Sequence, residues 1–244
     1  MAVAFNGANG TRRSSDEAEE FIIRSIVKGG FPVGAELPPE RIFALQLGIG
    51  RPALREALQR LERDGWLTLR HGHPARVNNY WEQGNLYTLV NLVQTSERLP
   101  ENLIVHLLEL RAVLAPAFIG QAVARQPERV VGLLVDGSAL PERGEEYAVF
   151  DWMVQKRTAM MSGNPLFVLV LNSFDPVYVS LATRYFQRAE CRLASQHFYQ
   201  ELLSAAMDRD DARAAEVVRA AMLESIRLWR GEGSGENEKS GGDG

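Results

Sequence analysis

The spacing of apolar residues changes once between residues 51 and 77, and this change restricts the fold more than any other feature of the chain. The first part of the stretch spaces its apolar side chains as one buried helical face requires, at Leu54, Ala57, Leu58 and Leu61. Residues 66–70 then alternate like a strand, 71–74 contain turn formers, and 75–77 can return as a second strand. The pattern predicts a helix followed by a small β-hairpin.

Two further helices are expected before this hairpin. Asp16 and Glu19 have the spacing of a capping box, which predicts a first helix over 16–29. Two prolines followed by Glu40 suit a first helical turn, so a second helix is expected over 38–47. Three helices followed by a hairpin are the element order of a winged helix-turn-helix.

Arginines gather in the same region. The net charge of the chain is −4, yet residues 41–76 hold seven arginines against three acidic residues. A basic region in an acidic chain indicates that this part meets a polyanion. Arg51 and Arg55 lie one turn apart opposite the apolar face, and Arg41 can reach the same groove edge of a duplex. The guanidinium fork matches phosphate oxygens and the paired acceptors of guanine, so we expect DNA binding.

The alternative for this charge is a solvated face balanced by Glu56, Glu62 and Asp64. The order of elements favours DNA binding, because a helix with exposed arginines is followed by a hairpin with a basic tip. The turn around Gly72 is also slim enough to enter the minor groove of DNA.

From residue 84 the strand signals stop, and amphipathic stretches punctuated by prolines predict helices only. The expected fold class is mainly α, with a winged helix-turn-helix of three helices and a small β-hairpin followed by an all-α ligand-binding bundle. The expected helices of the bundle are 84–95, 100–125, 127–137, 141–162, 164–186, 190–208 and 210–230. The expected division is a flexible N-terminus over 1–15, a winged-helix domain over 16–77, a linker over 78–84, an all-helical effector-binding domain over 85–230 and a disordered tail over 231–244.

Composition narrows the compartment and the chemistry. Hydrophobic residues make up 45% and charged residues 24%, as in soluble globular proteins. We find no signal-peptide run in the first twenty residues and no uninterrupted apolar stretch of membrane-spanning length. The single cysteine, Cys191, suits a reducing compartment, so a cytoplasmic protein is expected. His106 and His197, the histidines outside the hairpin turn, cannot supply a zinc-type site, and no catalytic constellation is evident, so neither a metal nor an enzyme is expected.

Residues 34–72, "GAELPPERIFALQLGIGRPALREALQRLERDGWLTLRHG", resemble the DNA-binding domain of the GntR family of bacterial transcription regulators. "LPPER" resembles the start of that family's second helix, and "RPALREALQRLERDGWL" resembles its recognition helix. The resemblance implies a DNA-binding set made of Arg41, Arg51, Pro52, Ala53, Arg55, His71 and Gly72. The sequence departs from the family at Gly50, Pro52 and Ala53, where threonines are usual, so the operator sequence is left open.

Within the family, the likeness to the FadR group of fatty-acid-metabolism regulators covers almost the whole chain, in "LQRLERDGWLTLRHGHPARVNNYWE", "SGNPLF", "RYFQRAE" and "LESIRLW". The likeness implies a protein that represses or activates fatty acid metabolism genes. Long-chain fatty acyl-CoA would be the effector that releases it from the operator, and no further cofactor is implied. The implied ligand-binding set is Arg111, Tyr185, Met222, Glu224, Ser225 and Trp229, with Met222 standing where the group has glycine. The side chains that could line a cavity for the fatty chain are Leu107, Leu108, Met153, Met160, Phe167, Leu171, Phe174 and Tyr178.

Two alternatives stay open. A relative of this class binds a metal and a small carboxylate, and Asp151 resembles its first metal ligand. Gln155, Tyr199 and Ala221 stand near the positions of its histidines. The first alternative is therefore a regulator of the same architecture that responds to an organic acid. The other is an enzyme acting on acyl thioesters. If the protein is a regulator, we expect a homodimer. One winged helix reads only a few base pairs, whereas a palindromic operator binds two winged helices.

Overall fold

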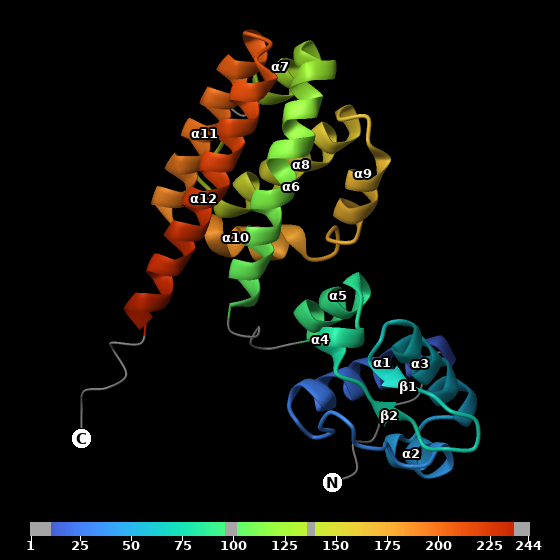
Figure 1. Ribbon diagram of the computed structural model, residues 1–244. Helices are drawn as coiled ribbons and strands as arrows, with labels where there is room; N and C mark the ends of the chain where they lie inside the picture. Colours follow the sequence, from blue (N-terminus) through green and yellow to red (C-terminus); the bar gives the residue numbers. More distant parts are fainter. Residues whose placement is uncertain (1–10, 96–101, 136–139, 237–244) are drawn as a thin grey trace, which may run out of the picture. The chain divides into compact units, whose positions relative to one another are not determined.

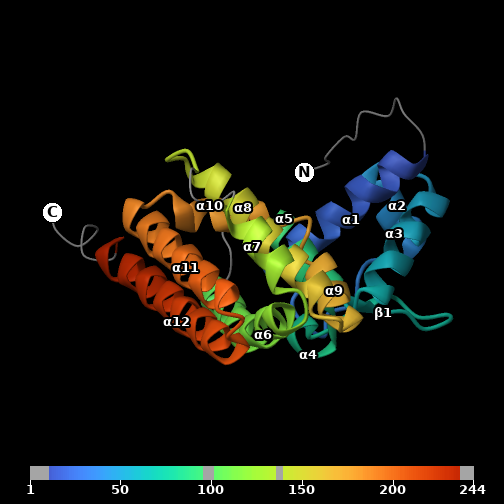
Figure 2. The same cartoon turned by 90° about the horizontal axis from the view of Figure 1, so that it is seen from above.

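The computed structural model describes residues 11–95, 102–135 and 140–236, and the chain divides into two compact units, Met1–Leu99 and Pro100–Gly244. Figures 1 and 2 show the helices of both units from two directions. Among the described residues, strands occur in the first unit alone, and the second unit is helical throughout. The expected fold class is therefore confirmed.

The first unit joins a helical core to a small hairpin. Its elements are α1 (Thr11–Val27), α2 (Glu40–Leu47), α3 (Arg51–Arg63), β1 (Leu67–Thr68), β2 (Arg76–Val77), α4 (Tyr80–Gln83) and α5 (Leu86–Thr95). The two strands pair antiparallel, with Leu67 opposite Val77. The apolar face of α3 is buried as its spacing predicts, and Trp66 is fully buried at the base of the hairpin.

The first helix begins earlier than its sequence indicates. The helix α1 starts at Thr11, so residues 11–15, expected to be a flexible N-terminus, are helical, while 1–10 lie outside the described residues. Asp16 is therefore inside α1 and is not its cap. Its carboxylate accepts a hydrogen bond from Arg60 at 2.5 Å, a partner distant in sequence that a local pattern does not reveal.

The turn that connects α3 to β1 requires glycine. Gly65 has φ of +84°, and a Cβ atom at this position would lie 2.3 Å from the carbonyl oxygen of Gln83. The side chain of Asn78 closes the same turn, because its Nδ2 donates to the carbonyl oxygen of Gly65 at 3.1 Å. The segment 78–84, expected to be a linker, thus packs on the first unit.

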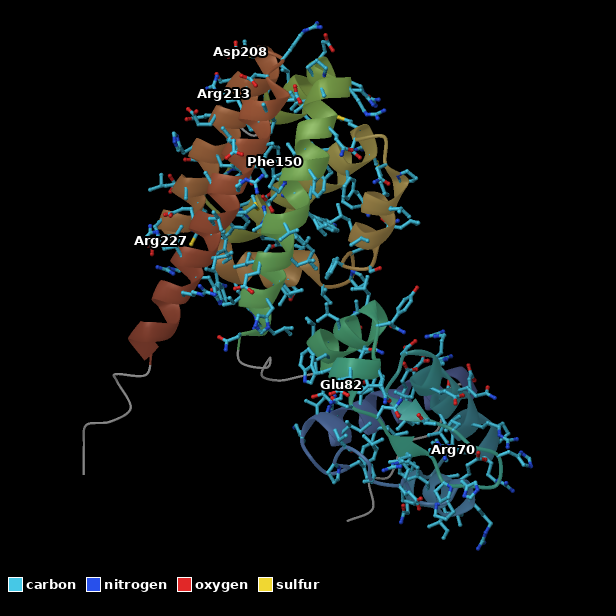
Figure 3. The ribbon with its side chains drawn as sticks, viewed as in Figure 1. Arg70, Glu82, Phe150, Asp208, Arg213 and Arg227 are labelled. Carbon is cyan, nitrogen blue, oxygen red and sulfur yellow. The ribbon has the colours of Figure 1, made fainter. Side chains whose placement is uncertain are left out.

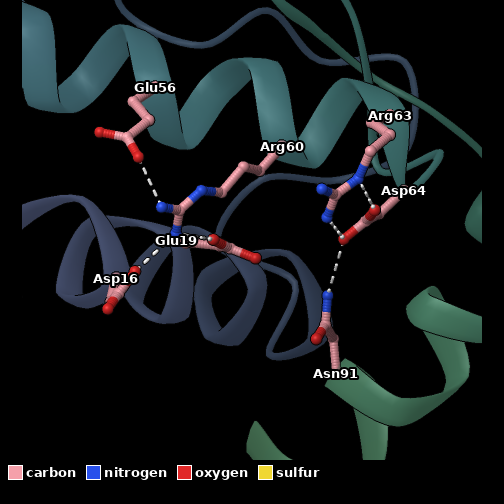
Figure 4. Close-up of polar contacts among 7 residues, drawn as sticks. All are labelled: Asp16, Glu19, Glu56, Arg60, Arg63, Asp64 and Asn91. Carbon is pink, nitrogen blue, oxygen red and sulfur yellow. Dashed lines mark hydrogen bonds and ion pairs between the residues drawn. The ribbon is translucent and has the colours of Figure 1, made fainter. Parts of the chain in front are cut away.

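Helix α5 is fastened to the C-terminal end of α3. The hydroxyl of Thr88 donates to the backbone carbonyl of Asp64, and Asn91 Nδ2 lies 3.3 Å from Asp64 Oδ2. Figure 4 shows the second of these contacts. The compact first unit therefore continues past residue 85. That the effector-binding domain starts at residue 85 remains a prediction.

The second unit is a helical bundle around α6. Its described helices are α6 (Leu103–Arg125), α7 (Pro127–Val135), α8 (Gly144–Met161), α9 (Pro165–Asn172), α10 (Tyr178–Phe186), α11 (Ala189–Met207) and α12 (Asp211–Glu236). Helix α6 packs along α12 and against α8. A Cβ atom at Gly120 would lie 3.3 Å from the side chain of Ala215, so the small residue lets α6 and α12 approach closely. Phe150 of α8 belongs to the core between these helices (Figure 3).

Among the described residues, α6 is the one helix long and apolar enough to cross a membrane. Its packing against α12 and α8 is that of a core helix of a bundle.

Two expected boundaries in this unit were wrong. The single helix expected over 164–186 is interrupted, because α9 ends at Asn172 and α10 begins at Tyr178 after a turn that contains Pro176. Helix α12 runs to Glu236, so residues 231–236, expected in a disordered tail, are helical. Residues 237–244 lie outside the described residues.

Candidate functional site

The N-terminal half of α3 presents exposed basic side chains. Arg51 and Arg55 are exposed, as is Arg41 on α2. Arg55 Nε lies 3.7 Å from Glu40 Oε1 in a solvent-exposed pair. Within the described chain, Arg41 and Arg51 have no ion-pair or hydrogen-bond partner. This half of α3 therefore keeps guanidinium groups available for an external anion.

The remaining predicted positions of this surface differ in exposure. Pro52 is exposed at the first turn of α3, whereas Ala53 is 1% exposed, so its side chain packs in the core. A contact from position 53 would have to use its backbone N–H. His71 and Gly72 are exposed in the loop between β1 and β2, and Gly72 has φ of +77°. The loop thus ends in a narrow, unobstructed tip.

The C-terminal half of α3 uses its arginines inside the protein. Arg60 lies 2.5 Å from Asp16, 3.3 Å from Glu19 and 2.5 Å from Glu56 (Figure 4). Hydrogen bonding, first to Asp16, raises the pKa of Arg60 against the opposing effect of burial. Burial raises the pKa of Glu19, which Arg60 partly offsets. The balanced-surface alternative thus describes this half of the helix and not the half that carries Arg51.

The second unit contains a partly open apolar cavity of about 110 Å³ that is lined by residues of α6, α8, α9 and α10 and of the turn between α9 and α10. Five of the side chains expected around a fatty chain do line it: Leu107, Leu108, Leu171, Phe174 and Tyr178. Met160 does not, because it is 53% exposed on the outer side of α8. Met153 and Phe167 pack against the core outside the cavity lining.

A buried ion pair stands beside this cavity. Arg111 Nη2 lies 2.9 Å from Asp151 Oδ1, and Asp151 is 1% exposed. The hydroxyl of Tyr199 donates to Oδ1 at 3.1 Å, and that of Tyr178 donates to Oδ2. Burial raises the pKa of both tyrosines well above the usual value, which keeps them protonated donors. Burial opposes the charge of Arg111, yet Asp151 and the surrounding groups raise its pKa.

This arrangement bears on the metal alternative. Both oxygens of the Asp151 carboxylate already accept hydrogen bonds, and Tyr199 approaches it as a donor. His106 and His197 are exposed. Among the described residues, no group of three histidine, cysteine or acidic side chains could hold a metal ion.

The ligand residues expected from the resemblance gather at a second, smaller pocket. Five of the six line it, and they are Arg111, Tyr185, Met222, Glu224 and Ser225. The sixth, Trp229, packs against the neighbouring cluster that contains Tyr185 and Phe186. Burial raises the pKa of the Tyr185 hydroxyl. Arg111, Tyr185 and Phe186 line both pockets, so the two spaces adjoin at these side chains.

Met222 fills much of this second pocket. Its volume is about 20 Å³, room for about one water molecule, and Met222 is 2% exposed within the core. Glu224 makes a surface ion pair with Arg227, 2.7 Å between Oε2 and Nε, which lowers the pKa of Glu224 through a hydrogen bond. A large polar group could enter only if side chains that line this pocket, such as Met222, moved.

One polar group of the larger cavity was missed from the sequence as a ligand contact. Gln155 lines the cavity and is 1% exposed. The sequence places Asp151 and Gln155 one helical turn apart on one face, but the surroundings of Gln155 depend on how α6 and α8 pack.

The exposed arginines at the start of α3, the hairpin tip and the attached helical bundle define the class of winged-helix transcription regulators. Residues 14–77 match the model described as "Bacterial regulatory proteins, gntR family", and residues 78–233 match that of the "FadR C-terminal domain". The chain therefore belongs to the GntR family, with a FadR-type C-terminal domain, and is a DNA-binding regulator and not an enzyme.

Curated relatives extend over most of the chain. The fatty acid metabolism regulator protein of Shewanella pealeana is 38% identical over 87% of this chain and 89% of its own length. That of Edwardsiella ictaluri is 37% identical over 89% and 91%. The solved structure of Lar, which controls the agr system of Listeria monocytogenes, has a TM-score of 0.55 at 14% identity, covers 93% of this chain and 99% of its own, and supports the fold alone.

Proposed function

We propose that the chain is a homodimeric, cytoplasmic regulator of fatty acid metabolism genes whose operator binding is released by long-chain acyl-CoA. The apolar cavity of about 110 Å³ carries the proposal, since a fatty chain gains roughly 0.8 kcal/mol for each buried methylene. The names of the relatives support the same class of genes.

The effector would span the two pockets. Its acyl chain lies in the apolar cavity, and its polar part follows the side chains of Arg111 and Tyr185, which both pockets share. The region of Ser225, Glu224 and Trp229 then receives the coenzyme A part after Met222 has moved. An organic acid is disfavoured as effector, because the Arg111 charge is already balanced by Asp151.

On the DNA side, Arg41, Arg51 and Arg55 would contact phosphates and base edges in the major groove, and His71 with Gly72 would enter the minor groove. Pro52 and the backbone of Ala53 would lie at the same contact. A dimer presents two such surfaces to a palindromic operator. A ligand that favours a bundle arrangement unsuited to that operator weakens DNA binding, and DNA weakens ligand binding by the same factor.

A gel-shift titration on a fatty acid gene promoter tests the proposal. We expect palmitoyl-CoA to release the protein from the operator, whereas free coenzyme A and citrate leave the complex intact. Release by citrate alone would favour the organic-acid alternative. A complex insensitive to every acyl-CoA would refute the effector while leaving the regulator class untouched.

A further inference from the structure

Two buried hydrogen-bond donors beside the apolar cavity have no partner among the described residues. They are Nε of Arg111 and Nε2 of Gln155, and both residues line the cavity. A buried donor left unpaired costs roughly 1 to 3 kcal/mol, so native proteins rarely keep one without a use. The Asp151 carboxylate and the hydroxyls of Tyr178 and Tyr199 beside them do have partners, so these two donors are the feature to be explained.

The two donors lie in one neighbourhood. Gln155 follows Asp151 by one turn of α8, which places their side chains on the same helix face. Asp151 in turn holds Arg111 through the 2.9 Å ion pair. The donors therefore come from two helices, α6 and α8, one on the residue paired with Asp151 and the other one helical turn from Asp151.

The charge of this neighbourhood is balanced, and both oxygens of the Asp151 carboxylate accept hydrogen bonds. The Asp151 carboxylate neutralises Arg111, and its oxygens accept from Arg111, Tyr178 and Tyr199. The two buried donors that lack a partner thus belong to a neutral amide and to an arginine whose charge Asp151 balances. A carboxylate ligand would be placed next to the anion Asp151, whereas a neutral oxygen would receive hydrogen bonds without that repulsion.

We propose that Gln155, together with Arg111, forms an oxygen-binding subsite inside the apolar cavity, and that the ligand it selects is an acyl chain bearing a neutral oxygen, a hydroxyl or a carbonyl. This subsite rests on the proposed acyl-CoA response and adds a preference within it. A plain hydrocarbon chain would bury both donors unpaired, while an oxygenated chain satisfies them.

Calorimetry on the full-length protein tests this subsite with hexadecanoyl-CoA and a series of hydroxy- and oxo-hexadecanoyl-CoA isomers that differ in the position of the oxygen. We expect at least one isomer to bind about ten-fold more tightly than the plain chain, as one or two added hydrogen bonds predict. Gln155→Met, which keeps the length of the side chain and removes its amide, should abolish that preference and bind the plain chain at least as well.

Gln155→Leu provides a second apolar replacement if the methionine variant folds poorly, and melting curves check both. Gln200→Leu, at an exposed position of α11, serves as the matched control and should keep the wild-type preference. A wild-type protein that prefers the plain chain to every isomer, or a Gln155→Met protein that retains the preference, overturns the subsite. If no thioester of either kind binds while operator binding persists, the proposed effector fails and the subsite fails with it; equal binding of all thioesters removes only the subsite.

Discussion

The ion pairs of Arg60 in the first unit and of Arg111 in the second lie at different depths. In the first unit Arg60 meets its three acidic partners at the rim of the α1–α3 packing and remains 25% exposed, and the N-terminal arginines of α3 face solvent. In the second unit Asp151 is 1% exposed and its pair with Arg111 borders a cavity. We therefore expect that the solvent-facing arginines of α3 can be replaced to alter binding with little effect on stability, whereas replacing a charge inside the bundle affects both ligand binding and folding.

The strongest way to break this comparison is to remove one partner of the inner pair. Asp151→Leu leaves the Arg111 guanidinium buried without a counter-charge, so we expect a loss of about 3 to 5 kcal/mol in the free energy of unfolding, measured by denaturant titration. The double replacement Arg111→Met with Asp151→Leu should recover most of this loss, since the two sites then pack as apolar groups. A single variant as stable as wild type would show that the pair is effectively solvated.

Met222→Ala tests the link between packing and ligand space in the same unit. Removing this buried side chain should cost about 2 to 5 kcal/mol of stability because it leaves a cavity. The same cavity enlarges the second pocket, so the affinity for palmitoyl-CoA, measured by calorimetry, should rise. Weaker binding in a folded Met222→Ala protein would mean that Met222 itself contacts the ligand.

At the rim of the first unit, Arg51→Ala should weaken operator binding by about 1 to 3 kcal/mol and relax the preference at one base position. The melting temperature should stay unchanged, because Arg51 has no partner in the described chain. Fluorescence anisotropy with operator variants measures the effect. The matched control is Arg60→Ala on the same helix, which should lower stability by up to about 1 kcal/mol and affect DNA binding less.

The smallest effect is expected for Glu224→Gln on the surface of α12. Hydrogen bonding to Arg227 lowers the pKa of Glu224, so the pair stabilises the fold above the usual carboxyl pKa of 4.5, and this contribution is lost as the pH falls through the lowered value. The Arg227 side chain is 71% exposed and that of Glu224 is 40% exposed, so the melting temperature should change by less than about 1 °C at pH 7. A difference between the two proteins that grew on acidification would contradict this sign.

The sequence was sufficient for the fold because the decisive pattern is local. Leu54, Leu58 and Leu61 are buried as their spacing predicts, and the hairpin follows where the period changes. The start of α1 escaped prediction because Asp16 resembles a cap until its distant partner Arg60 is known. Helical period also does not tell which apolar residues line a space and which face outward, so Met160 was expected at a cavity from which it points away.

Five of the six ligand residues predicted from the resemblance line one pocket. The resemblance could indicate such a group because it assigns each residue by its position in the chain. Gln155 escaped for the opposite reason. Its environment depends on how α6 and α8 face each other, and neither helix alone shows that an amide would be left without a partner. The unpaired donors became visible only once both helices were in place.

The attachment of α5 to the end of α3 has a mechanical consequence. The chain leaves the first unit through Thr88 and Asn91, both tied to Asp64 at the foot of the helix that carries Arg51. We therefore expect a displacement of α5 to be passed to the C-terminal end of α3 through these two hydrogen bonds. Because Arg51 lies at the opposite end of α3, a small rotation of α3 about its C-terminal end would displace Arg51 more than any other residue of the helix.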